Sequence, residues 1–158
     1  MKHLAFILLV TLMFASCKKE NNGNGQGCGN NNNFESFAFG TAYGECAGNC
    51  ATFYSISNKK IFPDDMQYYT GQLVFKTTAL TNDKYLLAKQ LIDNFPAYLK
   101  NNPDQTFGCP DCHDQGGIHI ETKENGIVKT WHIDNEIDKQ PIQIRAYIQQ
   151  LLAVLGQI

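Results

Sequence analysis

Four of the six cysteines lie in two short glycine-rich segments. Cys46 and Cys50 belong to YGECAGNC, and Cys109 and Cys112 belong to FGCPDCHDQGG. In an exported protein such cysteines form disulfides, and four of them permit three pairings that the sequence does not rank. A disulfide between the two segments would close a loop of roughly 60 residues and constrain the unfolded chain by about 4 kcal/mol, whereas local pairs would constrain it less. We expect structural disulfides, with Cys28 left over.

The second segment also matches the C-x-x-C-H pattern of haem c attachment. There, Cys109 and Cys112 would form thioethers with the haem vinyl groups and His113 would bind the iron. The string continues into two glycines and a strand, whereas such motifs usually lie in small helical domains. A poor helix start after Cys112 also disfavours a thioredoxin-like thiol pair. Zinc bound by all four cysteines is a third alternative, which an oxidising compartment disfavours.

A second potential metal site involves two histidines on neighbouring predicted strands. The segments 118–124 and 127–134 flank Asn125-Gly126, the pair that best fits a two-residue type I′ turn. Counting back from this turn places His119 directly opposite His132, with Cβ atoms about 5 Å apart. The two imidazoles could chelate one ion with Glu121 or His113 nearby. The simpler interpretation is a polar pair facing solvent, and we favour it.

The same register assigns the two faces of the hairpin. Ile118, Ile120, Trp131 and Ile133 share one face, which we expect in the core. The opposite face carries His119, Glu121, Thr130 and His132.

The remaining elements predict an α+β domain. Strands are expected at 34–42, 52–57 and 71–77. An amphipathic helix follows over 83–95, with Thr81 or Asn82 as its cap and Pro96 as its stop, and a second helix begins near Pro141. In chain order this gives β-β-β-α-β-β-α. We predict a single antiparallel sheet covered by two amphipathic helices.

The N-terminal residues indicate export. Lys2 and His3 precede an apolar run of 11 residues, Leu4 to Phe14, which is too short for the ~20 residues of a membrane-spanning helix. Phe14-Ala15-Ser16-Cys17 resembles a bacterial lipobox, which predicts a signal peptide at 1–16 and lipidation at Cys17. Residues 18–33 are almost entirely polar and predict a flexible tether. The domain expected at 34–158 would then be lipid-anchored.

The two cysteine segments and the Glu-Asn-Gly turn together resemble a group of small uncharacterised exported lipoproteins of Bacteroidota-type bacteria. FAFGTAYGECAGNCATFYSIS, CPDC and the following DQGG carry the resemblance, which covers most of residues 35–155. It implies a shared exported α+β domain with cysteines on two loops. It implies no activity, ligand or catalytic residue.

Charge and motifs narrow the function further. Without residues 1–16 the chain has 12 basic and 15 acidic side chains, a net charge of −3, which predicts no nucleic-acid partner. Hydrolase, P-loop and dinucleotide signatures are missing from the sequence. We therefore predict a non-enzymatic, disulfide-stabilised binding lipoprotein of the bacterial cell envelope, with a membrane-tethered monohaem electron carrier as the alternative. Lys18 after Cys17 favours the outer membrane.

Overall fold

A computed structural model describes residues 32–158, so Cys17, Cys28 and most of the predicted tether lie outside the described residues. One six-stranded sheet forms, in the spatial order β3-β2-β1-β5-β6-β4. The strands are β1 Ser36–Ala42, β2 Ala51–Ser57, β3 Lys60–Pro63, β4 Gln105–Phe107, β5 Gly117–Glu124 and β6 Ile127–Asp134. The helices are α1 Asn82–Asp93, α2 Ala97–Asn101 and α3 Ile142–Leu155, with a short 3-10 helix at Ile137–Lys139.

The α+β class is confirmed, but two details of the predicted sheet are wrong. The sheet is mixed, because β4 pairs with β6 in parallel. The strand expected at 71–77 is irregular, with one isolated bridge between Phe75 and Asp64, and the third strand is instead Lys60–Pro63. That strand follows a tight turn in which Asn58 and Lys59 both have positive φ, the geometry of a type I′ turn without glycine.

The hairpin prediction is confirmed in full. β5 and β6 pair antiparallel, with Ile120 opposite Trp131 and His119 opposite His132. Asn125 and Gly126 have φ of 52° and 76°, as a type I′ turn requires. Trp131 is 1 % exposed, and its Nε1–H donates to the carbonyl of Asn102 at 2.7 Å. The turn chemistry therefore fixed both the register and the buried face.

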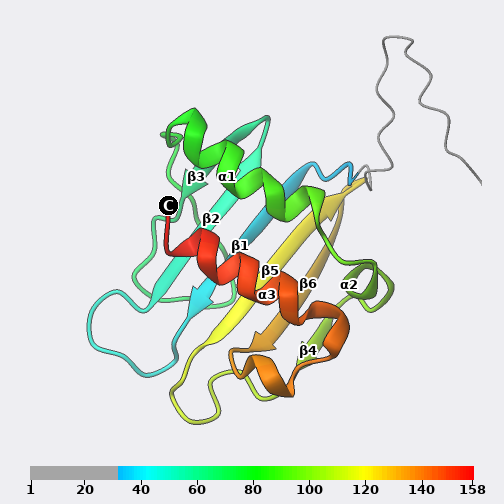
Figure 1. Ribbon diagram of the computed structural model, residues 1–158. Helices are drawn as coiled ribbons and strands as arrows, with labels where there is room; N and C mark the ends of the chain where they lie inside the picture. Colours follow the sequence, from blue (N-terminus) through cyan, green and yellow to red (C-terminus); the bar gives the residue numbers. More distant parts are fainter. Residues whose placement is uncertain (1–31) are drawn as a thin grey trace, which may run out of the picture.

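The core lies between the sheet and helices α1 and α3, which cover one face of it (Figure 1). Phe95 contacts Trp131 and Tyr147 edge to face, and the Tyr147 hydroxyl donates to the Leu91 carbonyl at 3.1 Å. These contacts tie both helices to β6. Among residues 32–158, no helix is long and apolar enough to cross a membrane.

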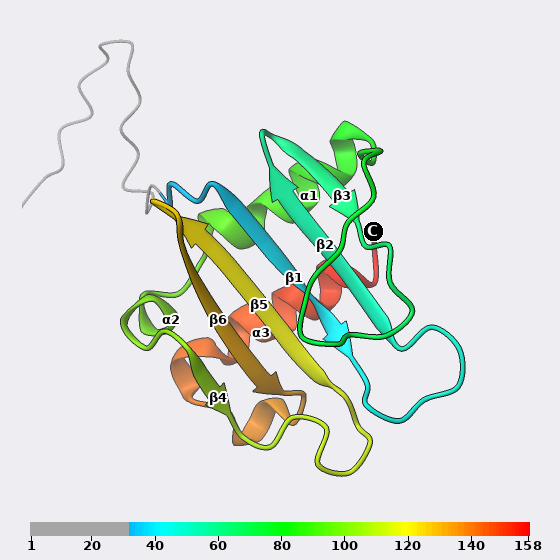
Figure 2. The same ribbon diagram turned by 180° about the vertical axis from the view of Figure 1, so that it is seen from behind.

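The opposite face of the sheet is partly covered by the irregular segment 64–81, here called the covering loop. Figure 2 shows it leaving β3, crossing in front of β2 and returning to α1. Phe53 is fully buried beneath this loop. Because side chains alternate along a strand, Phe53 points away from the helices, whereas its neighbours Thr52 and Tyr54 point toward them. The sheet thus has apolar contacts on both faces at β2, while β5 and β6 are less covered.

Candidate functional site

The two cysteine segments form local disulfides and meet at one end of the sheet. Cys46 bonds to Cys50, and Cys109 bonds to Cys112. Between the second pair, the Asp111 carboxylate accepts N–H bonds from Gly44 at 2.6 Å and from Gly116 at 3.0 Å. One side chain thereby links the loop after β1 to the loop before β5.

The paired glycines after the second disulfide are explained by close packing at this junction. Gly116 has φ of 71°, and a Cβ there would overlap the ring of Tyr43. At Gly117 a Cβ would lie 2.6 Å from the Cβ of Pro110. The string DQGG therefore brings the two loops together rather than forming a helix start or a phosphate-binding turn.

Asp134, at the end of β6, holds the second loop from the other side. Its carboxylate accepts from the backbone N–H of Glu136 at 3.0 Å and of Cys109 at 3.1 Å. These hydrogen bonds to the charged form, that from Glu136 first, lower the pKa of Asp134. The loop is thus fixed at Cys109 and again at Asp111.

A pocket of about 220 Å³ opens beside the junction. Its walls come from the two disulfide loops, the covering loop and the strands β5 and β6. The residues that line it are Ala42, Tyr43, Gly44, Tyr69, Pro110, Asp111, Gly117, Ile118, His119 and His132. Two loops near the disulfides, the covering loop and two strands therefore build one concave site.

The two histidines meet in this pocket. Their Nδ1 atoms are 3.3 Å apart. His119 is 2 % exposed, and its Nε2 is buried without a hydrogen-bond partner. Burial first, and His132 second, lower the pKa of His119 to about 4, while burial also lowers the pKa of His132. Both rings are therefore neutral at pH 7, and each has one unprotonated nitrogen that can accept a hydrogen bond or bind a metal.

Aromatic rings bury His119, which corrects the expectation that it faces solvent. The ring centroid of His119 lies 5.7 Å from Phe53 and 5.2 Å from Tyr69. Gly40 makes room for this packing, because a Cβ there would overlap the Phe53 ring and the Thr52 carbonyl. Burial, and then the charge of Glu121, raise the pKa of Tyr69, so its hydroxyl stays protonated.

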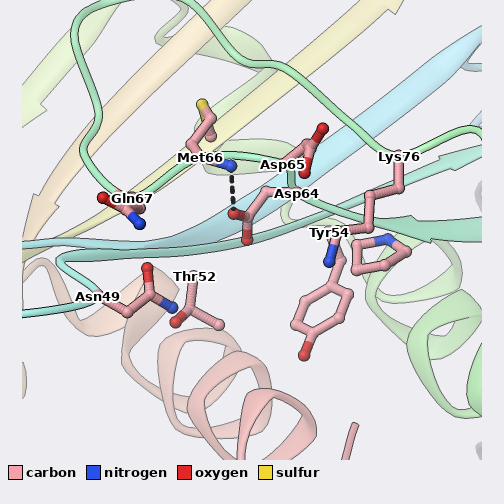
Figure 3. Close-up of a pocket in the computed structure, with 9 residues that line it drawn as sticks. Asn49, Thr52, Tyr54, Asp64, Asp65, Met66, Gln67 and Lys76 are labelled. Atoms are coloured by element: carbon pink, nitrogen blue, oxygen red, sulfur yellow. Dashed lines mark hydrogen bonds between the residues drawn. The ribbon is translucent and has the colours of Figure 1, made fainter.

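Asp64, the first residue after β3, attaches the start of the covering loop to β2. Its carboxylate accepts from the N–H of Phe53 at 2.7 Å and of Met66 at 3.1 Å. Figure 3 shows Asp64 and Met66 in a polar groove of about 540 Å³ that also includes Tyr54 and Lys76. The hydrogen bonds of Asp64 therefore join the start of the covering loop to β2.

The other predicted site residues lie outside the histidine pocket. Glu121 follows His119 on the same face of β5, half-buried, and burial raises its pKa. His113 lies with Cys109 and Cys112 at a separate pocket of about 260 Å³.

Within the described range 32–158, no three His, Cys, Asp or Glu side chains converge as a metal cluster. A disulfide and thioether attachment of haem exclude each other, and here Cys109 and Cys112 form the disulfide.

The residues that sequence reasoning missed are Asp111, Tyr43 and Tyr69. The position of Asp111 could have been recognised from the sequence, because an Asp between two cysteines and before two glycines suits a left-handed turn. In the structure its φ is 60°. Tyr69 had no such signal, since the covering loop has neither helical nor strand periodicity. Its role depends on where an irregular segment crosses the sheet.

Comparison with known proteins adds no family. No protein-family model matches the chain, and no curated protein matches it. The lipoprotein resemblance therefore rests on the sequence motifs alone.

Proposed function

We propose that the chain is a lipid-anchored lipoprotein of the bacterial cell envelope whose folded domain is a non-enzymatic binding module. The observation that carries the binding role is the pocket at His119, which combines a concave wall with a buried, unpartnered ring nitrogen. An unsatisfied buried polar atom lowers stability by about 1 to 3 kcal/mol. Nothing within the fold offsets this cost, which supports a binding role for the pocket that His119 lines.

The position of the pocket suits an anchored protein. The Glu35 carboxylate accepts the N–H of Gly126, so the start of β1 lies at the hairpin turn. The disulfide junction lies where β1 ends, opposite the start of β5. Seven strand residues span about 23 Å. An acyl anchor at Cys17 would thus attach at the end of the sheet away from the pocket, which leaves the pocket mouth free.

Membrane anchoring is tested with Cys17→Ala in the native host. We expect the wild-type chain to incorporate labelled palmitate and to sediment with membranes. The variant should do neither, because it lacks the cysteine that would carry the acyl chains on which membrane attachment depends. Cys28→Ser is the matched control and should be labelled normally. Equal labelling of Cys17→Ala would contradict the proposal.

The binding role is tested by site-specific photocrosslinking in intact cells. A photoreactive residue at Tyr43, on the exposed rim of the pocket, should give one discrete adduct. The same residue at Ile142, which is 71 % exposed on the helix side, should give none. Tyr69→Ala should weaken the adduct, because it removes one wall of the pocket. Equal adducts from both positions, or none from Tyr43, would count against a binding pocket.

A further inference from the structure

We propose that His119 and His132 bind one divalent transition-metal ion through their Nδ1 atoms, with the remaining coordination positions open to the pocket. This inference rests on the proposed binding function and names its ligand class. Zn²⁺ is the reference ion, since it binds imidazole nitrogen and is stable in an oxidising compartment.

The spacing of the two nitrogens fits a tetrahedral ion. Zinc–nitrogen bonds are about 2.0 to 2.1 Å long, so two ligands at the tetrahedral angle lie about 3.3 to 3.4 Å apart. The Nδ1 atoms are 3.3 Å apart in the structure. Their ring centroids are 4.6 Å apart with an interplanar angle of 61°, so the rings are inclined rather than stacked flat. The pair already has the separation of a two-histidine chelate.

The surroundings also favour a ligand over a structural hydrogen bond. In a neutral pair one Nδ1 can donate to the other, but Nε2 of His119 stays buried without a partner in either tautomer. A pair that served only to pack the sheet would be replaced by apolar side chains without loss of stability. The hydrogen bond between the rings therefore does not account for the burial of His119, and packing alone does not require two imidazoles here.

The rigidity of the backbone makes the site preorganised. His119 and His132 are directly paired across two long strands, and the hairpin register is fixed by the Asn125-Gly126 turn. Phe53 and Tyr69 hold the His119 ring from two sides. Little conformational entropy is lost on metal binding, which raises the affinity that two protein ligands can give.

The open coordination positions give the site its specificity. Two protein ligands leave two tetrahedral positions for water or for a donor group of a second molecule. These positions adjoin a pocket lined by Tyr43, Tyr69 and Asp111. Both carboxylate oxygens of Asp111 already accept N–H bonds, so it stays at the wall. The site is of the open kind, in which the metal holds an external ligand.

The experiment uses the full chain, purified from membranes in detergent with a tag that lacks histidine. Cys28→Ser is the background, because a free thiol would compete for the metal. Zn²⁺ is titrated by calorimetry, and Co²⁺ by the intensity of its ligand-field absorption, which is high for tetrahedral sites. We expect one ion per chain. In ¹⁵N spectra of the histidine rings, the chemical shifts of the two Nδ1 atoms should change on metal binding.

The chain contains its own control. Apart from His3 in the predicted signal peptide, the histidines are His113, His119 and His132. His132→Ala, at a half-exposed position, should weaken Zn²⁺ binding by about tenfold or more, because half of the protein ligand set is lost. His113→Ala should bind as the background does. A second variant, His119→Phe, should weaken Zn²⁺ binding by at least the same factor while keeping an aromatic ring in place.

Three outcomes would overturn the inference: no saturable binding, equal affinity in His132→Ala, or loss of binding in His113→Ala. The test is independent of the proposed function. Discrete crosslinking at Tyr43 without metal binding would leave the binding module intact and remove only the metal. Metal binding without any adduct would support the ion site and contradict the wider binding role.

Discussion

Gly44 and Asp111, 67 residues apart in the chain, are joined by a 2.6 Å hydrogen bond from the Gly44 N–H to Oδ2 of the Asp111 carboxylate. The other oxygen of that carboxylate accepts from Gly116. The two disulfides each close a loop within one segment, so neither of them connects the segments. The connection between the loops therefore depends on a carboxylate rather than on sulfur.

Asp111→Asn tests this connection. Asparagine tolerates the left-handed φ of 60° but offers only one acceptor oxygen, so one N–H bond is lost without backbone strain. We expect a loss of about 1 to 2 kcal/mol in urea unfolding and faster hydrogen exchange at Gly44. Asp114→Asn is the control, since Asp114 has φ of 57° on the same loop. Equal effects of the two variants would refute the role of Asp111.

Disulfide pairing can be tested by tryptic digestion without reduction. Lys59, Lys60 and Lys76 lie between the two cysteine segments, so local pairs leave the segments in separate peptides, each two hydrogens lighter than its reduced form. Local loops of four or five residues should each stabilise the fold by about 2 kcal/mol, so reduction lowers the melting temperature. A peptide in which a disulfide joins the two cysteine segments would contradict local pairing. An adduct of haem mass, together with a pyridine haemochrome spectrum, would favour the electron carrier.

Trp131 and His132 are adjacent residues on opposite faces of β6, and their alanine variants should behave differently. Trp131→Ala removes a side chain that is 1 % exposed together with its bond to Asn102, and should cost about 3 to 5 kcal/mol. His132→Ala should cost less than about 1 kcal/mol in metal-free buffer. Tryptophan emission should be blue-shifted and poorly quenched by iodide. Emission like that of free tryptophan would show that the face of the hairpin that carries Trp131 is exposed to solvent.

Acid should destabilise the fold through His119. Its folded pKa of about 4 lies below the ordinary 6.5, so the unfolded chain binds the proton more tightly. The contribution to stability is full above pH 6.5 and is lost as the pH falls toward 4, by about 3 kcal/mol in total. His132, Tyr69 and Glu121 are the titratable groups around it.

Urea unfolding with chelator at pH 7, 5.5 and 4 would measure this loss. His119→Phe should have a flatter dependence than the wild type, because it keeps the ring but cannot be protonated. His113→Phe, altered at an exposed histidine, should keep the wild-type slope. If His119→Phe and the wild type lose stability in parallel, His119 is not the titrating group.

Local sequence signals predicted the elements with strong turn or helix chemistry. Asn125-Gly126 determined the hairpin register, and Thr81 occupies the N-cap position of α1, although its side chain makes no capping hydrogen bond. The signals failed where an element is short or its turn lacks glycine. Strand β3 follows Asn58-Lys59, and β4 has three residues that pair in parallel with a strand that comes later in the chain. Such pairing is decided by tertiary contacts rather than by local preference.

The candidate site was only half predictable for a related reason. Alternation along β5 and β6 placed His119 and His132 side by side, but alternation indicates a face and not what covers it. Leu73, Val74 and Phe75 resemble a strand, yet they belong to the covering loop, where Val74 is 48 % exposed. The burial of His119 follows from the path of that loop, which no period in the sequence encodes.

The pairing of β1 with β5 also sets the order in which the chain can assemble. Residues 36–42 find their second neighbour only in residues 117–124, and the core-facing helix α3 comes last of all. Contacts of such long sequence separation form slowly. Until residues 117–158 have emerged, β1 has only β2 as a partner strand, and Phe37 and Phe39 have no helical cover from α3. Were the chain exported as proposed, it would reach its final fold only after translocation is nearly complete.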